Sequence, residues 1–310
     1  MHTARLLRIP LVVLTFVGLF GRFASAQTSS AHTSGFAYLK NGGGAEITAL
    51  GDLHVAGLVS PEMMRMNPAA AALLSATNVS FDYALLPVGG NTDLFSAVST
   101  AGNGFALGIS AFLLRDGELE VRTAPTVDPL STSIPQNFSL GATAAFRIDS
   151  LALGLTLKWL NQRITVYNAD GYALDFGAIY NLSGEYQLGF AISDLGKMGK
   201  LLNESSELPT RGTLTLAATP ELLSSPLFRT KILLSAQDGF EDGATHITAG
   251  VAEEYDQHFT LRLGYLSGDK IRGLSFGAGI HYGAFALDYA FAPSLNGFNS
   301  TNVFGLTARL

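Results

Sequence analysis

Between residues 78 and 310, large apolar side chains alternate with small ones. The chain breaks there into segments of about 7 to 12 residues, separated by clusters of Gly, Asn, Asp, Pro and Ser. In many segments a large apolar residue occupies every second position and Gly, Ala or Ser fills the positions between, as in residues 151–159, 171–180, 186–193, 274–282 and 284–291. Successive side chains of a strand point to opposite faces, so this pattern predicts strands with one bulky and one small face.

The composition of the small face decides between two architectures. A soluble sandwich buries its large face and shows polar residues such as Lys, Glu and Thr on the other. Here the second face is mostly Gly, Ala and Ser, which is a poor surface for water. In a closed barrel in lipid, large residues meet acyl chains and small ones face a crowded interior. We therefore predict an all-β fold, a transmembrane antiparallel β-barrel with aromatic residues near its interfaces.

The segments predict fourteen strands. This even number lets every strand pair with its neighbour, and the last with the first, so no unpaired edge meets lipid. Twelve or sixteen strands remain open, because sequence-based boundaries are uncertain by about two to four residues. The connections 115–137 and 195–209 are long enough to be external loops. The strands are expected near residues 78–86, 94–100, 104–114, 138–147, 151–163, 170–182, 185–194, 210–219, 228–238, 244–255, 259–267, 271–282, 284–292 and 301–310.

Residues 1–26 have the features of a signal peptide. Arg5 and Arg8 stand near the start, an apolar stretch runs from Ile9 to Phe20, and Ala24-Ser25-Ala26 offers a cleavage site of small residues. The apolar stretch is shorter than the roughly 20 residues that span a bilayer. We expect cleavage after Ala26, export, and location in the outer membrane of a Gram-negative cell, with the barrel formed by residues 78–310.

Residues 27–77 lack the alternation and are predicted to form a small N-terminal plug in the barrel mouth or the periplasm. Asn41-Gly42-Gly43-Gly44 is a flexible break, and a short helix is expected within Pro61–Ala76. Asn67 precedes Pro68, which suits the first turn of a helix, so Asn67 is expected to cap that helix. A structural turn is the favoured role here. A ligand or gating contact by Asn67, Pro68 and Ala69 is the alternative.

Composition excludes several functional classes. The 310 residues include no cysteine, which rules out disulfides, thiolate metal sites and cysteine nucleophiles. Three of the 19 Lys and Arg residues lie in the predicted signal peptide, so sixteen basic residues oppose 25 acidic ones in the rest of the chain. That excess of negative charge argues against nucleic acid as a partner. No run of 18 uncharged apolar residues follows residue 26, so no membrane helix is expected.

No motif for catalysis, metal or cofactor binding stands out, and we expect a protein that is not an enzyme. The acidic group Glu253-Glu254 with Asp256 and His258 falls between two strands and is interpreted as a solvated turn. Gly102-Asn103-Gly104 is interpreted as a hairpin turn. No nucleophile elbow or phosphate-binding loop occurs. None of the histidines has metal-ligand spacing: His2, His32, His54, His246, His258 and His281.

Charged residues at inward-facing strand positions are the main candidates for a lumen site. They are Lys158, Asp175, Arg262 and Asp288, with Arg147 as a further candidate. Charges inside a membrane barrel usually pair with one another, and this is the favoured interpretation. A role in lining a translocation path is the alternative.

Several short stretches occur in a fixed order along the chain: Leu58–Ala72 around Asn67-Pro68-Ala69-Ala70, Gly171–Gly177, Ser193-Asp194-Leu195-Gly196, Leu208–Gly212 and Leu287–Phe291. Together they resemble the PorV/PorQ family of FadL-like outer-membrane barrels, over about residues 35–310. The sequence departs from the family pattern at Ala70, where a glycine often follows Asn-Pro-Ala, and at the Arg309-Leu310 end, which lacks an aromatic residue. Gly305, Ala308 and Leu310 still resemble a barrel-assembly signal.

This resemblance implies type IX protein secretion or surface attachment of secreted proteins, with secretion-machinery proteins or exported cargo as partners beside the outer-membrane lipids. The alternative is a FadL-like transporter of hydrophobic small molecules, in which the plug moves around Asn67-Pro68. A lipid-modifying barrel enzyme is a third possibility. It needs a histidine near the rim, and only His246 and His281 lie on predicted strands.

Overall fold

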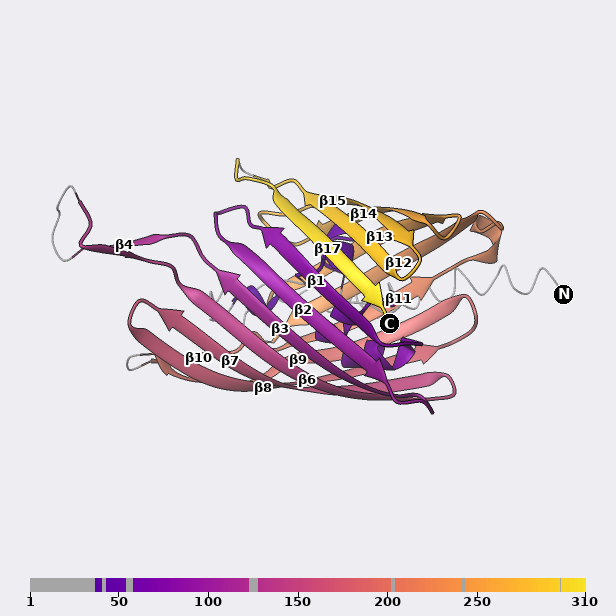
Figure 1. Ribbon diagram of the computed structural model, residues 1–310, viewed down its shortest axis with the longest axis horizontal. Coiled ribbons are helices and arrows are strands. Elements are labelled where there is room, and N and C mark those ends of the chain that lie inside the picture. The colour runs from indigo at the N-terminus through magenta and orange to yellow at the C-terminus, as the bar shows by residue number, and fades with distance from the viewer. Residues whose placement is uncertain are drawn as a thin grey trace.

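The protein is a closed β-barrel (Figure 1). A computed structural model describes residues 37–40, 43–53, 58–122, 128–201, 204–240, 243–295 and 297–310. The predicted signal peptide, residues 1–26, lies outside these ranges. No helix among the described residues has the length and hydrophobicity needed to cross a membrane.

Fourteen strands form the wall within the described part of the chain. In chain order they are β1 (Asn78–Leu85), β2 (Asn91–Thr100), β3 (Phe105–Arg115), β6 (Gln136–Ile148), β7 (Leu151–Ile164), β8 (Tyr167–Asn181), β9 (Tyr186–Leu201), β11 (Arg211–Ala218), β12 (Phe228–Gly239), β13 (Thr245–Tyr255), β14 (Phe259–Ser267), β15 (Leu274–Tyr282), β16 (Phe285–Ala292) and β17 (Thr301–Arg309).

Antiparallel pairing runs around the whole ring. Each wall strand pairs with the next along the chain, and β1 closes the ring on β17, from Asn78 opposite Arg309 to Leu85 opposite Asn302. The all-β fold and the count of fourteen strands are therefore confirmed. Closure gives every strand two partners, which removes the exposed edges of an open sheet.

The expectation that 195–209 is a loop was wrong for most of its length. Strand β9 continues to Leu201, and β10 (Glu204–Glu207) pairs back onto it. A bulge explains the error, because the register between β8 and β9 shifts between Leu174 and Phe176, and the consecutive residues Ser193 and Asp194 are both buried. A bulge inserts an extra residue and reverses the alternation beyond it, so the period-two pattern is interrupted although the strand continues.

The connection after β3 contains a two-stranded ribbon. Strands β4 (Leu119–Val121) and β5 (Ser131–Ser133) pair only with each other, and the ribbon projects past one end of the barrel (Figure 1). The connections at the opposite end are mostly short turns, such as Gly102–Gly104 between β2 and β3, where Asn103 has a positive φ of 50°. The hairpin expected at Gly102-Asn103-Gly104 is thus confirmed.

The two faces of the wall differ as the alternation predicts. Large side chains point outward and are exposed, for example Leu157 at 55% and Phe285 at 60%. Inward positions carry small residues, such as Ala152, Gly154 and Thr156 on β7. Trp159 is exposed on the outer face and is not enclosed between two stacked sheets.

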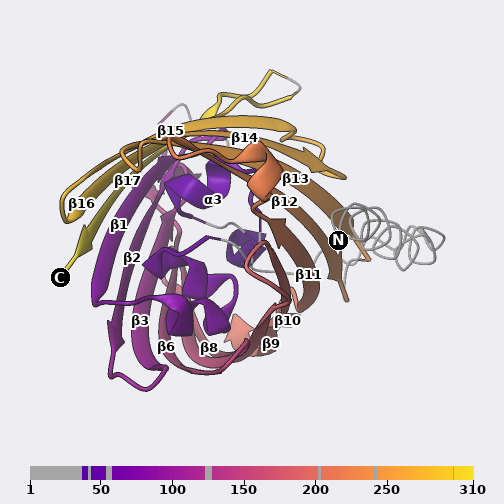
Figure 2. The ribbon, with the colours of Figure 1, turned by 90° about the vertical axis from the view of Figure 1, so that its right-hand side faces the viewer.

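Segments from residues 37–40, 43–53 and 58–74, here called the inner segment, lie inside the ring (Figure 2). The inner segment contains the 3₁₀ helices η1 (Ala37–Lys40), η2 (Pro61–Arg65) and η3 (Pro68–Leu73) and the short helix α3 (Ala45–Ala49). Helix α3 contacts β14 to β17, η2 contacts β1 to β3, and η3 contacts β3 and β6 to β8. The short helix expected within Pro61–Ala76 is therefore present as two 3₁₀ helices.

Inward-facing glycines let the inner segment approach the wall at backbone distance. A Cβ added at Gly154 would overlap the peptide group between Pro68 and Ala69, and one added at Gly264 would overlap the peptide group between Leu50 and Gly51. A Cβ at Gly177 would overlap the Asn67 side chain. Only a residue without a side chain leaves room for a second backbone there, which explains the small inner face in structural terms.

Filling the Gly154 position should therefore weaken docking of the inner segment. We expect Gly154→Ala to destabilise the folded barrel by about 1–3 kcal/mol, the usual range for overpacking a filled core. Thermal unfolding in detergent measures this effect. Gly184→Ala is the matched control, because a Cβ at Gly184 meets nothing within 4 Å. Equal unfolding temperatures for the two variants would contradict the packing described above.

Candidate functional site

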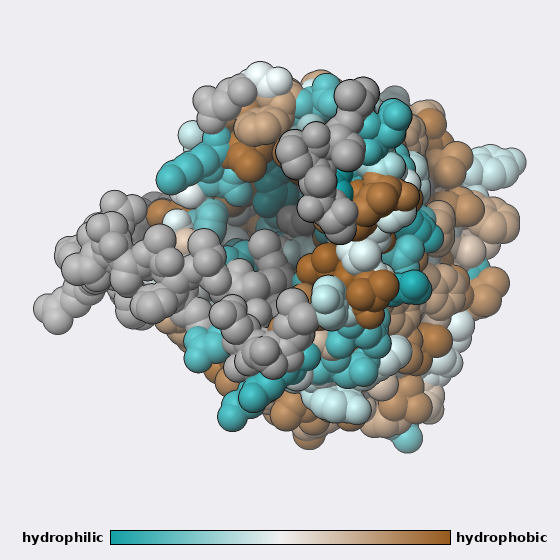
Figure 3. Space-filling model, turned by 90° about the vertical axis from the view of Figure 1, so that its left-hand side faces the viewer, coloured by the Kyte–Doolittle hydropathy of each residue, from teal (hydrophilic) through white to brown (hydrophobic). Residues whose placement is uncertain are grey.

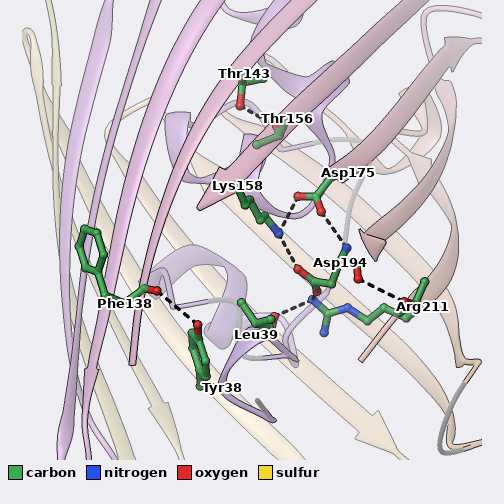
Figure 4. A network of polar contacts seen from close by, with 10 residues as sticks. Tyr38, Leu39, Phe138, Thr143, Thr156, Lys158, Asp175, Asp194 and Arg211 are labelled. Atoms are coloured by element: carbon green, nitrogen blue, oxygen red, sulfur yellow. Dashed lines mark hydrogen bonds and ion pairs between the residues drawn. The ribbon is translucent and has the colours of Figure 1, made fainter. Parts of the chain in front are cut away.

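A buried group of four charged residues lies on the inner wall, here called the Lys158 cluster: Lys158, Asp175, Asp194 and Arg211 (Figure 4). Lys158 Nζ lies 2.6 Å from Asp175 Oδ2 and 2.7 Å from Asp194 Oδ1. Arg211 Nη2 lies 3.2 Å from Asp194 Oδ2. All four residues are at most 3% exposed. Burial removes the water that surrounds a charge, and attraction to a partner of opposite charge at hydrogen-bond distance offsets that free-energy cost.

The bulge in β9 positions Asp194 in this cluster. Asp194 adopts a left-handed conformation with φ of 62°, which is uncommon for a residue other than glycine. Its backbone N–H donates to Asp175 Oδ1 at 2.8 Å, and its carbonyl accepts from Thr210 Oγ1 at 3.1 Å. The irregular backbone is thus held by one side chain on β8 and by another immediately before β11.

The Lys158 cluster also holds the first part of the inner segment. Arg211 Nη2 donates to the Leu39 carbonyl at 2.6 Å, and the Tyr38 hydroxyl lies 3.4 Å from the Phe138 carbonyl (Figure 4).

Arg65 of η2 lies with its guanidinium carbon 4.1 Å from the centre of the Phe112 ring. Burial lowers the pKa of Arg65 to about 10, so it remains charged at neutral pH.

A second charged group, the Arg262 cluster, lies against helix α3 and consists of Arg262, Glu46 and Asp288. Arg262 Nη1 donates to Asp288 Oδ1 at 2.7 Å, and Nη2 donates to Glu46 Oε1 at 3.0 Å. Arg262 and Asp288 come from β14 and β16, whereas Glu46 comes from the inner segment. One guanidinium therefore links two wall strands to α3 through charge-assisted hydrogen bonds.

Two more carboxyl groups lie at the start of α3. Asp82 Oδ1 accepts a hydrogen bond from the Ala45 N–H at 2.9 Å, and a Cβ placed on Gly44 would lie 2.8 Å from Glu62 Cγ. Burial raises the pKa of Glu62 to about 7, and the nearby Glu46 carboxylate adds to this effect. Glu62 is therefore partly protonated near neutral pH.

An open pocket of about 560 Å³ lies at the end of the barrel that carries the β4–β5 ribbon, and we call it the mouth pocket. Figure 3 shows this end hollowed, with hydrophilic residues around the opening and hydrophobic ones over much of the flank. The inner segment contributes Tyr38, Lys40, Gly43, Thr48 and Asp52 to its lining. The wall and its connections add apolar groups such as Leu86, Pro87, Val88, Leu114, Leu266 and Ile271.

Arg211 connects the mouth pocket with the Lys158 cluster. Its side chain lines the pocket, although the residue is only 2% exposed. Its Nε and Nη1 atoms have no hydrogen-bond partner among the described residues. A buried guanidinium with free N–H groups can bind an acceptor on a ligand or a water molecule.

A further ion pair links the pocket rim to the inner segment. Arg272, in the connection between β14 and β15, pairs with Asp52 and has Asp269 at 3.8 Å. Burial lowers the pKa of Arg272 to about 10. Asp52 has a positive φ of 56°, and its backbone N–H donates to the Ile47 carbonyl at 3.0 Å.

Asn67 and Pro68 lie against β7, β8 and β9. Asn67 Oδ1 accepts the Ala69 N–H at 3.1 Å, so the expected helix cap is confirmed. Asn67 Nδ2 also donates to the Phe190 carbonyl at 3.2 Å and approaches the Ala178 carbonyl at 3.4 Å. The polar groups of Asn67 are thus used in docking η3 to the wall, and the gating role of Asn67, Pro68 and Ala69 stays a prediction.

The four inward-facing charged residues predicted from the sequence form ion pairs in two separate clusters. Lys158 and Asp175 meet in one cluster, and Arg262 and Asp288 in the other. Arg147 is exposed near the end of β6. The expectation that the acidic group lies between two strands was wrong for Glu253 and Glu254, which belong to β13, whereas Asp256 and His258 lie in the turn after it. No group of three or more His, Asp or Glu residues suited to a metal ion occurs among the described residues.

Several residues of these clusters were missed by sequence reasoning. Asp194 lies in the bulge, where the alternation fails, and Arg211 begins a strand. Glu46 and Glu62 belong to the inner segment, whose partners are distant in sequence, such as Arg262 for Glu46. One signal for Asp194 and Arg211 was available in the sequence. Charged residues are few in this exported, apolar chain, and a charge in a membrane barrel is expected to face the interior and to pair.

Comparison with known proteins finds similar folds among solved outer-membrane channels. No family model matches the chain, and no curated protein matches it in sequence. Among solved structures, the Pseudomonas putida toluene transporter TodX is similar, with a TM-score of 0.61 and 12% identity over 86% of this chain and 97% of that chain. The CymD monoaromatic hydrocarbon channel gives 0.60 and 12% over the same shares. A Pseudomonas aeruginosa FadL homologue gives 0.56 and 11%, again over 86% and 97%.

At these identities the similarity establishes the fold and no more. The class of protein defined here is a closed fourteen-strand barrel of the type seen in FadL-like channels. None of the comparisons supports the more specific resemblance to the PorV/PorQ family or a part in type IX secretion. The FadL-like alternative is the one with structural relatives.

Removing the central cation should test the Lys158 cluster. We expect Lys158→Met to destabilise the protein by about 3–5 kcal/mol, because Asp175 and Asp194 would remain buried without their shared partner. Arg122→Met is the control, since Arg122 pairs with exposed Glu120 and such pairs contribute about 0–1 kcal/mol. Chemical denaturation in detergent compares the two. Similar losses in both variants would show that the cluster is not a structural centre.

Proposed function

We propose that this protein is an outer-membrane channel for hydrophobic small molecules, and that the inner segment is its plug. The observation that carries the proposal is a partly apolar mouth pocket that ends on a segment held inside a FadL-type barrel. The solved relatives are named as a toluene transporter and a monoaromatic hydrocarbon channel. The proposal assigns no catalytic residue.

The outer face supports a location in the outer membrane. Large apolar side chains cover it, including Leu155, Leu261 and Phe304, whereas the interior carries the buried charges. This is the reverse of a soluble protein and fits a wall in contact with acyl chains. The predicted signal peptide at residues 1–26 would direct export.

Loop length supports an orientation in which the mouth pocket opens to the outside. Outer-membrane barrels have short turns on the periplasmic side and longer extracellular connections. The β4–β5 ribbon and β10 lie in the long connections, at the same end as the pocket. A ligand would bind in the mouth pocket, with its apolar part near Leu86 and Leu266 and any polar group near Arg211, before reaching the inner segment.

Secretion remains a lesser candidate, carried only by the sequence resemblance. Affinity purification after mild crosslinking of outer membranes tests it. Recovery of secretion-machinery components or exported cargo together with the protein would favour that function over transport.

Passage past the inner segment requires part of it to move, and a disulfide can prevent that movement. A Cβ placed on Gly250 would lie 3.4 Å from Leu50 Cβ, close to the roughly 3.5–4.5 Å that a disulfide needs. The chain has no native cysteine, so Leu50→Cys with Gly250→Cys introduces a single possible bridge. Uptake of labelled toluene into Gram-negative cells without their own hydrocarbon channel should fall at least tenfold when the bridge forms and recover on reduction.

The controls separate the function from its mechanism. The reduced double variant and the Leu50→Cys single variant should take up toluene as the unmodified protein does, and a labelled hexose should enter through none of them. Toluene uptake equal to that of cells without the protein would contradict the proposed function. Full uptake by the oxidised double variant would contradict movement of this part of the inner segment.

A further inference from the structure

Glu62 and Asp82 form a buried carboxyl pair that the proposed transport function does not use. Glu62 is 4% exposed and Asp82 is 2% exposed. Asp82 contacts Ala45 through a hydrogen bond, and Glu62 packs over Gly44, the residue immediately before it. The two side chains therefore contact neighbouring residues, Gly44 and Ala45, at the start of α3. Helix η2, which carries Glu62, also contacts β1, which carries Asp82.

Each of these groups has an oxygen without a partner. Glu62 Oε2 and Asp82 Oδ2 are buried and accept no hydrogen bond from any described residue. The hydroxyls of Ser80 and Ser96 nearby are also buried without partners, and these two residues lie opposite each other on β1 and β2. A buried carboxylate oxygen that receives no hydrogen bond disfavours the charged form, whereas a protonated carboxyl can donate from that oxygen to an acceptor such as a serine hydroxyl.

The surroundings supply too little positive charge to ionise both groups. Arg262 of β14 is already shared by Glu46 of α3 and Asp288 of β16. Arg65 on η2 is directed to the Phe112 ring and acts on the aspartates of the Lys158 cluster. Lys231 of β12 acts on Glu46, and His281 of β15 acts on Asp288. Asp288 and Glu46 are further negative charges that act on both Glu62 and Asp82.

We propose that the Glu62–Asp82 pair is a proton-binding site that controls docking of the inner segment. When the pair holds a proton, η2 and the start of α3 stay against β1. When the pair loses it, repulsion among Glu62, Asp82 and Glu46 loosens this contact. The consequence for transport rests on the proposed function, but docking itself can be measured without any substrate.

The direction of the pH effect follows from the raised pKa of Glu62, which is about 7 in the folded protein against an ordinary 4.5. A group whose pKa is raised by docking binds more protons in the docked state. Docking is therefore most stable below about pH 4.5, weakens as the pH rises toward 7, and changes little above that.

A single engineered cysteine reports docking in the purified protein in detergent. Met66→Cys places a thiol at a position that is 1% exposed, at the end of η2, and Ser183→Cys gives an exposed control thiol in the connection after β8. The readout is the rate at which a small water-soluble thiol reagent modifies the Met66→Cys variant, divided by its rate with the Ser183→Cys variant. This ratio removes the pH dependence of the thiols themselves.

Between pH 5 and pH 8 the ratio should rise about tenfold or more, because one pKa unit corresponds to a factor of ten. Glu62→Gln, which is neutral at every pH, should give a low ratio with little pH dependence, and Asp82→Asn should flatten the profile in the same way. Glu118→Gln changes an exposed carboxylate and should keep the full rise. A flat ratio in the protein with native carboxyl groups, or an unchanged rise in both Glu62→Gln and Asp82→Asn, overturns the proposal. Either result would leave toluene uptake, and with it the proposed function, to be judged separately.

Discussion

The close approach of a second backbone to the inner wall governs the rest of the structure. At Gly154 and Gly264 the wall comes so near to the inner segment that even a methyl group would overlap it. A barrel of fourteen strands lies between small barrels, which side chains alone can fill, and porins of sixteen or eighteen strands, which leave an aqueous channel. Here the peptide of the inner segment occupies the interior, so the residues that face it must be small.

Charge provides the second constraint, because a filled interior holds little water to solvate ions. Two clusters of ion pairs meet this constraint on two sides of the inner segment, around Lys158 and around Arg262. Each cluster joins wall strands to the inner segment, through the Leu39 carbonyl in one and Glu46 in the other. The same contacts that satisfy the charges also hold the segment in place, which links stability of the barrel to any movement that opens it.

The sequence was sufficient to predict the strands of the wall, but it was insufficient to predict the contacts that the inner segment makes inside the ring. Alternation of large and small residues is a local signal with a period of two, and it located fourteen strands and the inward positions of Lys158, Asp175, Arg262 and Asp288. It failed at Asp194, because a bulge changes which face the following residues occupy. It could not pair Arg262 with Glu46 or Arg211 with Leu39, since these contacts join residues more than 170 positions apart and depend on how the inner segment lies in the ring. The helix cap at Asn67 was predictable because it is formed within three residues.

The central proposal is that the inner segment acts as a plug and closes the interior of the barrel. The electrical conductance of a planar bilayer containing the purified protein tests this most directly. The account predicts no steady ion current through the intact protein, and a stable current once residues 37–74 are deleted. A steady open-pore current through the intact protein would contradict it.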